Sequence, residues 1–134
     1  GYCVNRSSSD RVSIRIAEMY LIAAEAGSYL PAELEKAKGY LLDLKAKRLK
    51  PEAMETQRTK VGAMDAEQLR AEIADERARE LIGEGHRWMD LRRTTRPDIV
   101  KTYKDRTYTL NANDARYTLP FPQSAIDSNP ELND

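Results

Sequence analysis

The sequence predicts an all-α fold of antiparallel helix pairs, followed by an irregular, partly extended tail at the C-terminus. Apolar residues recur at spacings of three and four through the body of the chain, which is typical of buried helix faces. The first two periodic segments are separated by only a few residues, which favours an antiparallel pair. The helical period is lost from residue 98 onward. We therefore expect an irregular lead-in at 1–10, a helical body at 11–93 and a tail at 94–134.

The first helix follows the polar stretch 6–10, with Asp10 or Ser13 as its cap and Gly27 as its stop. Its apolar residues form two faces, and a helix of that kind packs on two sides. The two faces comprise Ile14, Ala17, Leu21 and Ala24, and Ile16, Tyr20, Ala23 and Ala26.

The second helix begins near Pro31, because proline is favoured in a first helical turn. Acidic residues lie near its start and basic residues near its end, an order that complements the helix dipole. The segment from Pro51 to Met64 is interpreted as a loop. The apolar stripe of the second helix comprises Leu34, Ala37, Leu41 and Leu44.

The third helix opens at Asp65, and Gln68 three residues later completes a capping box. We expect this helix to end near Gly83 or Gly85, and the segment 86–93 to add another turn or two. In the tail, Pro97 breaks the preceding helix, and 115–122 is expected to be extended because prolines bias the residues before them. Ser124 is expected to cap a short turn.

Composition and charge exclude several classes of protein. The 134 residues carry 22 basic and 22 acidic side chains, so the formal net charge is zero, which argues against a nucleic-acid partner. It also gives no electrostatic reason to bind an anionic membrane, and no apolar run approaches the ~20 residues of a membrane span. The 40% content of hydrophobic residues is too high for a disordered chain.

Single copies of cysteine and histidine limit the possible sites. Cys3 alone excludes an internal disulfide framework and thiolate zinc clusters, and His86 alone excludes motifs with two histidines. We predict no metal, no cofactor and no catalytic residue. The first ten residues lack the basic and apolar regions of a signal peptide. His86 as a general base and Cys3 as a lipid-attachment site or nucleophile are the weaker hypotheses.

Carboxylates replace apolar residues on the third helix. The stripe that begins with Leu69 and Ile73 continues onto Glu76, Glu80 and Glu84. One hypothesis is a catalytic pair, Glu80 with Glu84, as in glycoside hydrolysis. The favoured hypothesis is a structural ion-pair network that joins this helix to the segment after it. The candidate partners are Arg77, Arg79, Arg87, Arg92 and Arg93.

Glycines and aromatic residues near this helix also allow two interpretations. Gly83 and Gly85 are interpreted as a tight corner rather than a phosphate cradle, because no strand precedes them. Trp88 is interpreted as a core residue rather than a stacking platform. The aromatic residues of the tail either anchor it to the helices, which we favour, or form a platform for sugars. They are Tyr103, Tyr108, Tyr117 and Phe121.

Three segments resemble the SusD/RagB family. RIAEMYLIAAEA at 15–26 resembles a signature helix of that family, and ADERARELIGEGHRWMDLRR at 74–93 resembles its most recognisable segment. YTLPFPQSAIDSNPEL at 117–132 is similar to the family's C-terminal ending. The three occur in the family's order, and their spacing extends the resemblance to nearly the whole chain.

The resemblance implies a surface-exposed lipoprotein of the outer membrane that binds glycans for nutrient uptake. Such proteins are not enzymes, and they deliver oligosaccharides, or peptides in some members, to a SusC-like TonB-dependent transporter. Their helix pairs are arranged like tetratricopeptide repeats. This chain resembles only the C-terminal part of the family, so the lipid anchor is expected outside it and Cys3 does not inherit that role. Any membrane contact is expected only through that anchor.

The motif residues carry over as structural determinants, and the ligand contacts remain unknown. The alternative hypotheses are a helical-repeat adaptor that binds a protein and no sugar, and the glycosidase considered above. The structural determinants that the resemblance implies are Glu76, Arg77, Glu80, Glu84, Arg87, Trp88, Asp90, Asn129 and Pro130.

Overall fold

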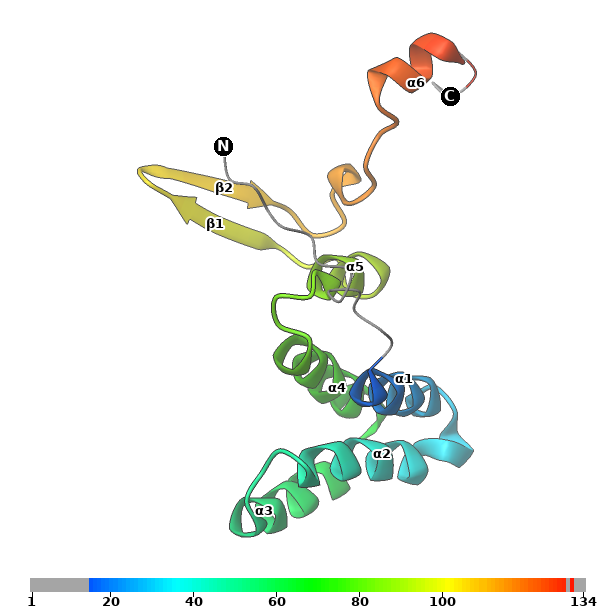
Figure 1. Ribbon diagram of the computed structural model, residues 1–134, viewed down its shortest axis with the longest axis vertical. Helices are drawn as coiled ribbons and strands as arrows, with labels where there is room; N and C mark the ends of the chain where they lie inside the picture. The colour runs from blue at the N-terminus through cyan, green and yellow to red at the C-terminus, as the bar shows by residue number, and fades with distance from the viewer. Residues whose placement is uncertain (1–14, 130, 132–134) are drawn as a thin grey trace, which may run out of the picture. The chain divides into compact units, whose positions relative to one another are not determined.

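The computed structural model describes residues 15–129 and 131, and it confirms a mainly helical fold. The chain divides after Glu84 into two compact units, whose elements are labelled in Figure 1. The described part of the first unit is entirely helical. Its elements are α1 (Ile16–Ser28), the 3₁₀ turn η1 (Pro31–Glu33), α2 (Leu34–Ala46), α3 (Pro51–Gly62) and α4 (Ala66–Glu80).

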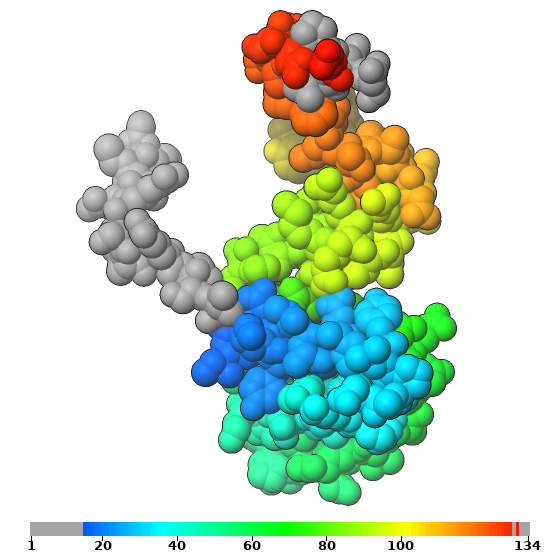
Figure 2. Space-filling view, turned by 90° about the vertical axis from the view of Figure 1, so that its right-hand side faces the viewer, coloured from blue at the N-terminus to red at the C-terminus, as the bar shows by residue number. Residues whose placement is uncertain are grey.

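Helices α1 and α2 form the expected pair, which packs side by side through a close contact. Figure 2 shows α1 in blue directly against the start of α2 in cyan. The helix ends at Ser28, one residue after the predicted stop at Gly27. A Cβ added at Gly27 would lie 3.0 Å from the Cβ of Ala37, so the glycine lets the two helices approach. The predicted caps at Asp10 and Ser13 lie outside the described residues.

The core of the first unit uses the first predicted face of α1 and, from the second face, the partly buried Tyr20. Ala17, Leu21 and Ala24 are buried, whereas Ile16 on the second face is 77% exposed. Helix α1 packs against two helices of this unit, α2 and α4. The buried core cluster is Ala17, Leu21, Ala24, Ala37, Leu41, Leu44, Val61, Leu69 and Ile73.

Helix α3 occupies the segment that was expected to be a loop, so that expectation is wrong. Pro51 stands in its first turn, where the missing N–H costs nothing. Met54 and Val61, seven residues apart and thus two turns apart, are its buried residues. Two apolar positions in twelve residues are too few to stand out as a period.

The capping box that opens α4 is confirmed. The side chain of Asp65 accepts a hydrogen bond from the backbone N–H of Gln68, and the Gln68 side chain accepts one from the backbone of Asp65. The α-helix ends at Glu80, three residues before the expected stop. Gly83 and Gly85 then take φ values of +80° each, in the left-handed region that suits glycine. Residues 81–85 form turns, as expected at these two glycines.

The second unit contains more regular structure than the predicted irregular tail. Helix α5 confirms the expected turns before Pro97, but two strands follow it as an antiparallel hairpin (Figure 1). Residues 115–117 form a 3₁₀ turn rather than an extended segment, and the turn at Ser124 is a helix whose N-cap is Pro122. The elements are α5 (His86–Arg93), β1 (Ile99–Tyr103), β2 (Arg106–Leu110), η2 (Ala115–Tyr117) and α6 (Gln123–Ser128).

The hairpin follows from residue types that the helical period does not detect. Its strands are rich in β-branched and aromatic residues, which favour extended backbone. The turn between them contains Lys104 at φ +53°, without the Asn-Gly or Asp-Gly pair that usually marks a tight hairpin. The strong local signal for a turn is therefore missing from the sequence.

Candidate functional site

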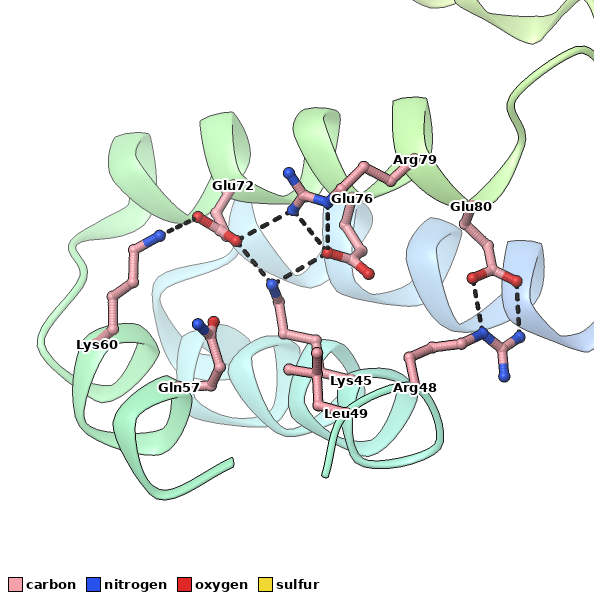
Figure 3. A pocket seen from close by; sticks show the side chains of 9 residues that line it. All are labelled: Lys45, Arg48, Leu49, Gln57, Lys60, Glu72, Glu76, Arg79 and Glu80. Atoms are coloured by element: carbon pink, nitrogen blue, oxygen red, sulfur yellow. Dashed lines mark hydrogen bonds and ion pairs between the residues drawn. The ribbon is translucent and has the colours of Figure 1, made fainter. Parts of the chain in front are cut away.

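A charged pocket of about 500 Å³ lies within the first unit, between α4 and the helices α2 and α3 (Figure 3). Four cationic and three anionic side chains line it, so the charges nearly balance. The lining residues are Lys45, Arg48, Leu49, Gln57, Lys60, Glu72, Glu76, Arg79 and Glu80.

Helix α4 supplies the carboxylates of this pocket at a spacing of four residues. Glu72, Glu76 and Glu80 therefore lie one above the other on the same face. Like charges at this spacing repel one another, so the face needs cations from other helices. Figure 3 shows these cations reaching up from α2, α3 and the turn between them.

Glu72 is held by two lysines from different helices. Lys45 Nζ of α2 lies 2.7 Å from its Oε1, and Lys60 Nζ of α3 lies 2.7 Å from its Oε2. Burial alone would raise the pKa of Glu72, but the hydrogen bonds and charges of Lys45 and Lys60 together lower it from 4.5 to about 2. This carboxylate thus links α4 to both α2 and α3.

Glu76 shares the buried Lys45 with Glu72. Lys45 Nζ lies 3.0 Å from Glu76 Oε2, and Arg79 Nη2 lies 2.7 Å from the same oxygen. Glu76 is itself buried, at 7% exposure. A buried charge without partners is costly, so the two cations are what allow a carboxylate at this core position.

Glu80 receives a paired contact from one arginine and a further contact from another. Arg48 donates from Nε to Oε2 at 2.9 Å and from Nη2 to Oε1 at 2.7 Å, which is a bidentate geometry. Arg15, the residue before α1, donates from Nη2 to Oε1 at 2.9 Å and from Nη1 to a carboxylate oxygen of Glu84. The hydrogen bond from Arg48 is the main reason that the pKa of Glu80 is lowered.

A carboxylate network exists within the first unit, with Arg79 as one of its predicted partners. Of the five candidate arginines, Arg79 binds Glu76, whereas Arg77 lies 3.9 Å from Glu18 of α1. Within the first unit, the network joins α4 to the helices before it. A signal for the missing carboxylate Glu72 was present, because it lies four residues before Glu76 on the same stripe. The cations that the sequence did not identify are Arg15, Lys45, Arg48 and Lys60.

The geometry of Glu80 and Glu84 does not suit a glycosidase pair. Both carboxylates bind the same guanidinium, that of Arg15. A general acid in glycoside hydrolysis needs a raised pKa, whereas the pKa of Glu80 is lowered. The chemistry that this arrangement supports is electrostatic cross-linking of helices.

Gln57 is an uncharged polar residue in the same pocket. Its Oε1 is buried and accepts no hydrogen bond from the described residues. Figure 3 shows the amide pointing into the pocket, between Lys60 and Lys45.

In the second unit, an aromatic pair joins α5 to the chain after the hairpin. Trp88 stacks on Tyr117 with ring centroids 5.3 Å apart and planes 5° from parallel. Tyr117 is fully buried, and its hydroxyl donates to the backbone carbonyl of Pro97. Burial also raises the pKa of this tyrosine. The sequence predicted four aromatic anchors for the tail, and Tyr117 is one. The prediction is wrong for Tyr103, Tyr108 and Phe121, which are more than half exposed.

The remaining predicted site residues of the second unit lie on α5 and after α6. Asp90 is buried and accepts from Arg93 Nε and Nη2 at 3.1 and 2.9 Å. Arg87 is exposed on α5, and His86 is its first residue. Asn129 follows α6, and its side chain accepts from the backbone N–H of Glu131. Pro130 lies outside the described residues.

In each unit, one of these contacts joins two of the three segments that resemble the family. Arg15 of the first segment binds Glu80 and Glu84 of the second. Trp88 of the second segment stacks on Tyr117 of the third. Among residues 15–129 and 131, no helix is long and apolar enough to span a membrane, and no group of three potential metal ligands occurs.

Comparison with known proteins agrees with the resemblance of these segments. The model of the SusD family matches residues 2–134. A SusD-like protein, P25, of Formosa agariphila is 33% identical over 129 residues, which cover 93% of this chain. The chain spans 23% of the length of that curated relative. The match to the family model covers nearly every residue, and the chain therefore belongs to the SusD family.

Proposed function

We propose that this chain is the C-terminal, mainly scaffolding part of a glycan-binding protein for nutrient uptake. The observation that carries the proposal is the match of the SusD family model to residues 2–134. The chain spans 23% of the curated relative, which supports a longer protein with its principal ligand contacts elsewhere. The expected ligand is an oligosaccharide, with a peptide as the other possibility, and the expected partner is a SusC-like TonB-dependent transporter at the outer membrane.

The site geometry supports a structural role for the motif residues. Glu76, Glu80 and Glu84 all bind cations of other side chains at close range. One face of the Trp88 ring stacks on Tyr117. Side chains engaged in this way hold helices in place, so we propose that they act as structural determinants and that the protein is a binding component rather than an enzyme.

The role in uptake is tested with the complete gene product. We expect it to carry a signal peptide and a lipid-attachment cysteine, to co-purify from outer membranes with a TonB-dependent transporter and to bind oligosaccharides on a glycan array. A gene without an export signal and without a neighbouring transporter gene would contradict the proposal.

A second candidate, a helical-repeat adaptor, is favoured by the outer face of α1. Ile16, Met19 and Ile22 lie at successive spacings of three, and they are 77%, 52% and 46% exposed. Apolar side chains grouped on one exposed helix face often mark a contact with another polypeptide. Glycan binding by the complete protein that is lost when exposed aromatic residues are changed to Ala would reject an adaptor that binds no sugar.

A further inference from the structure

The β1–β2 hairpin presents two exposed tyrosines on one face. The register pairs Lys101 with Tyr108 and Tyr103 with Arg106, so these four residues share a face of the two-stranded sheet. Tyr103 is 66% exposed and Tyr108 is 55% exposed. They lie at diagonal positions across the strands, which places the two rings within reach of one ligand.

Cations surround these tyrosines without compensating carboxylates. Lys104 Nζ lies 5.5 Å from the centre of the Tyr103 ring, and Lys101 and Arg106 stand beside the rings in the register. Within the described part of the chain, none of these three cations forms an ion pair, and Asp105 is the single acidic residue of the hairpin. The hairpin therefore carries a net charge of about +2 in a chain whose total is zero.

The opposite face of the hairpin has a different character. Thr102 and Thr107 face each other there, with their hydroxyl oxygens 3.3 Å apart. Val100 and Thr109 form the neighbouring pair. Rings and cations are thus concentrated on one face, which we call the tyrosine face and define as Lys101, Tyr103, Arg106 and Tyr108 with the adjacent Lys104.

We propose that the tyrosine face binds an anionic oligosaccharide, a substrate class that deepens the proposed glycan-binding function and rests on it. The C–H groups on one side of a pyranose ring carry partial positive charge, which complements the negative face of a tyrosine ring. Carboxylate or sulfate groups on the sugar would accept charge-assisted hydrogen bonds from Lys101, Lys104 and Arg106. A neutral sugar has no charged group that could pair with these cations.

Binding measurements on the 134-residue chain test this proposal, first with different sugars and then with variants of the tyrosine face. The anionic probes are an oligogalacturonate and a sulfated carrageenan oligosaccharide, and maltohexaose is the neutral comparison. In isothermal titration calorimetry, the chain is expected to bind an anionic probe at least tenfold more tightly than maltohexaose. The affinity for the anionic probe is expected to fall as the salt concentration rises. Tyr103→Ala and Tyr108→Ala are each expected to weaken binding about tenfold, and Tyr103→Phe to retain it. Lys104→Gln, in the turn, removes charge without altering either strand, and it is expected to reduce the salt dependence.

Tyr29→Ala is the matched control. Tyr29 is also exposed and has a cation, Arg70, 4.8 Å from its ring centre, but it lies outside the hairpin. The control is expected to bind as the unsubstituted chain does. Glycan binding that none of the hairpin variants changes would overturn this inference and leave the proposed function standing.

Other outcomes are equally decisive. No binding of either anionic probe, or equal binding of maltohexaose, would overturn the inference. Tighter binding of a single-stranded oligonucleotide than of either sugar would show that the face serves a nucleic acid instead. The proposed function fails separately, when the complete gene product binds no member of a broad glycan panel.

Discussion

Neutralising Glu72 perturbs the carboxylate that links three helices. In Glu72→Gln the side chain keeps its size, but Lys45 and Lys60 each lose one charged partner. The fall in pKa from 4.5 to about 2 corresponds to an upper limit of about 3 kcal/mol, at about 1.4 kcal/mol per pH unit. Lys60 and Arg79 are more than half exposed, and exposed pairs contribute at most about 1 kcal/mol. We therefore expect the substitution to lower the free energy of unfolding by about 2 kcal/mol at pH 7.

The pH dependence of this loss distinguishes electrostatics from packing. Because the pKa of Glu72 is lower in the folded chain than in the unfolded chain, the unfolded chain binds more protons between pH 4.5 and about 2. The contribution of Glu72 is therefore complete above about pH 5 and is lost as the pH falls toward 2. Urea unfolding of both proteins across this range is expected to show a difference that shrinks toward zero in acid.

Glu67→Gln is the control for this experiment. Glu67 is an exposed residue in the first turn of the same helix, so its neutralisation is expected to cost only a few tenths of a kcal/mol. A loss below about 0.5 kcal/mol for Glu72→Gln, or a loss that persists unchanged at pH 2, would refute the electrostatic account.

Four further substitutions test other contacts by denaturant unfolding. Glu80→Ala is expected to lower the free energy of unfolding by about 2 kcal/mol. This is less than the several kcal/mol of a fully buried pair, because the side chains of Arg15 and Arg48 are 40% and 45% exposed. A loss below about 0.5 kcal/mol would mean that water solvates the carboxylate. Tyr117→Phe removes the buried hydroxyl that donates to a backbone carbonyl, and it is expected to cost about 1 kcal/mol; an unchanged midpoint would count against that hydrogen bond. In Gly39→Ala the new methyl group meets no neighbour, so the substitution is expected to stabilise α2 by about 0.5–1 kcal/mol. In Gly27→Ala the methyl group meets Ala37, so no stabilisation is expected. Equal stabilisation at both positions would contradict the close approach of α1 and α2.

Local signals in the sequence predicted the parts of the fold that depend on neighbouring residues. The capping box of Asp65 and Gln68 needs only a four-residue segment, so its prediction was correct. The buried face of α1 follows from its own period, and Leu21 and Ala24 are indeed fully buried. Elements with a weak local signal, such as α3 with its two buried residues, were missed.

The site was only partly predictable, because its partners come from distant positions. The stripe on α4 identified Glu76 and Glu80 as unusual carboxylates, but the sequence gives no distance between them and Lys45 or Arg48. The helix dipole alone accounts for basic residues near the end of the second helix, so the sequence gives no sign that Lys45 is a buried partner of Glu76. Long, flexible cationic side chains reach their partners from many backbone positions, so the pairing emerges only from the packing of helices.

The central claim is that residues of the family segments act as links between helices, and a double-mutant cycle on Arg15 and Glu80 tests it most directly. Arg15→Gln, Glu80→Gln and the double variant are compared with the unsubstituted chain by urea unfolding at pH 7. The contact at 2.9 Å predicts a coupling free energy of about 1 kcal/mol or more. Single-variant losses that add within about 0.3 kcal/mol in the double variant would contradict the claim.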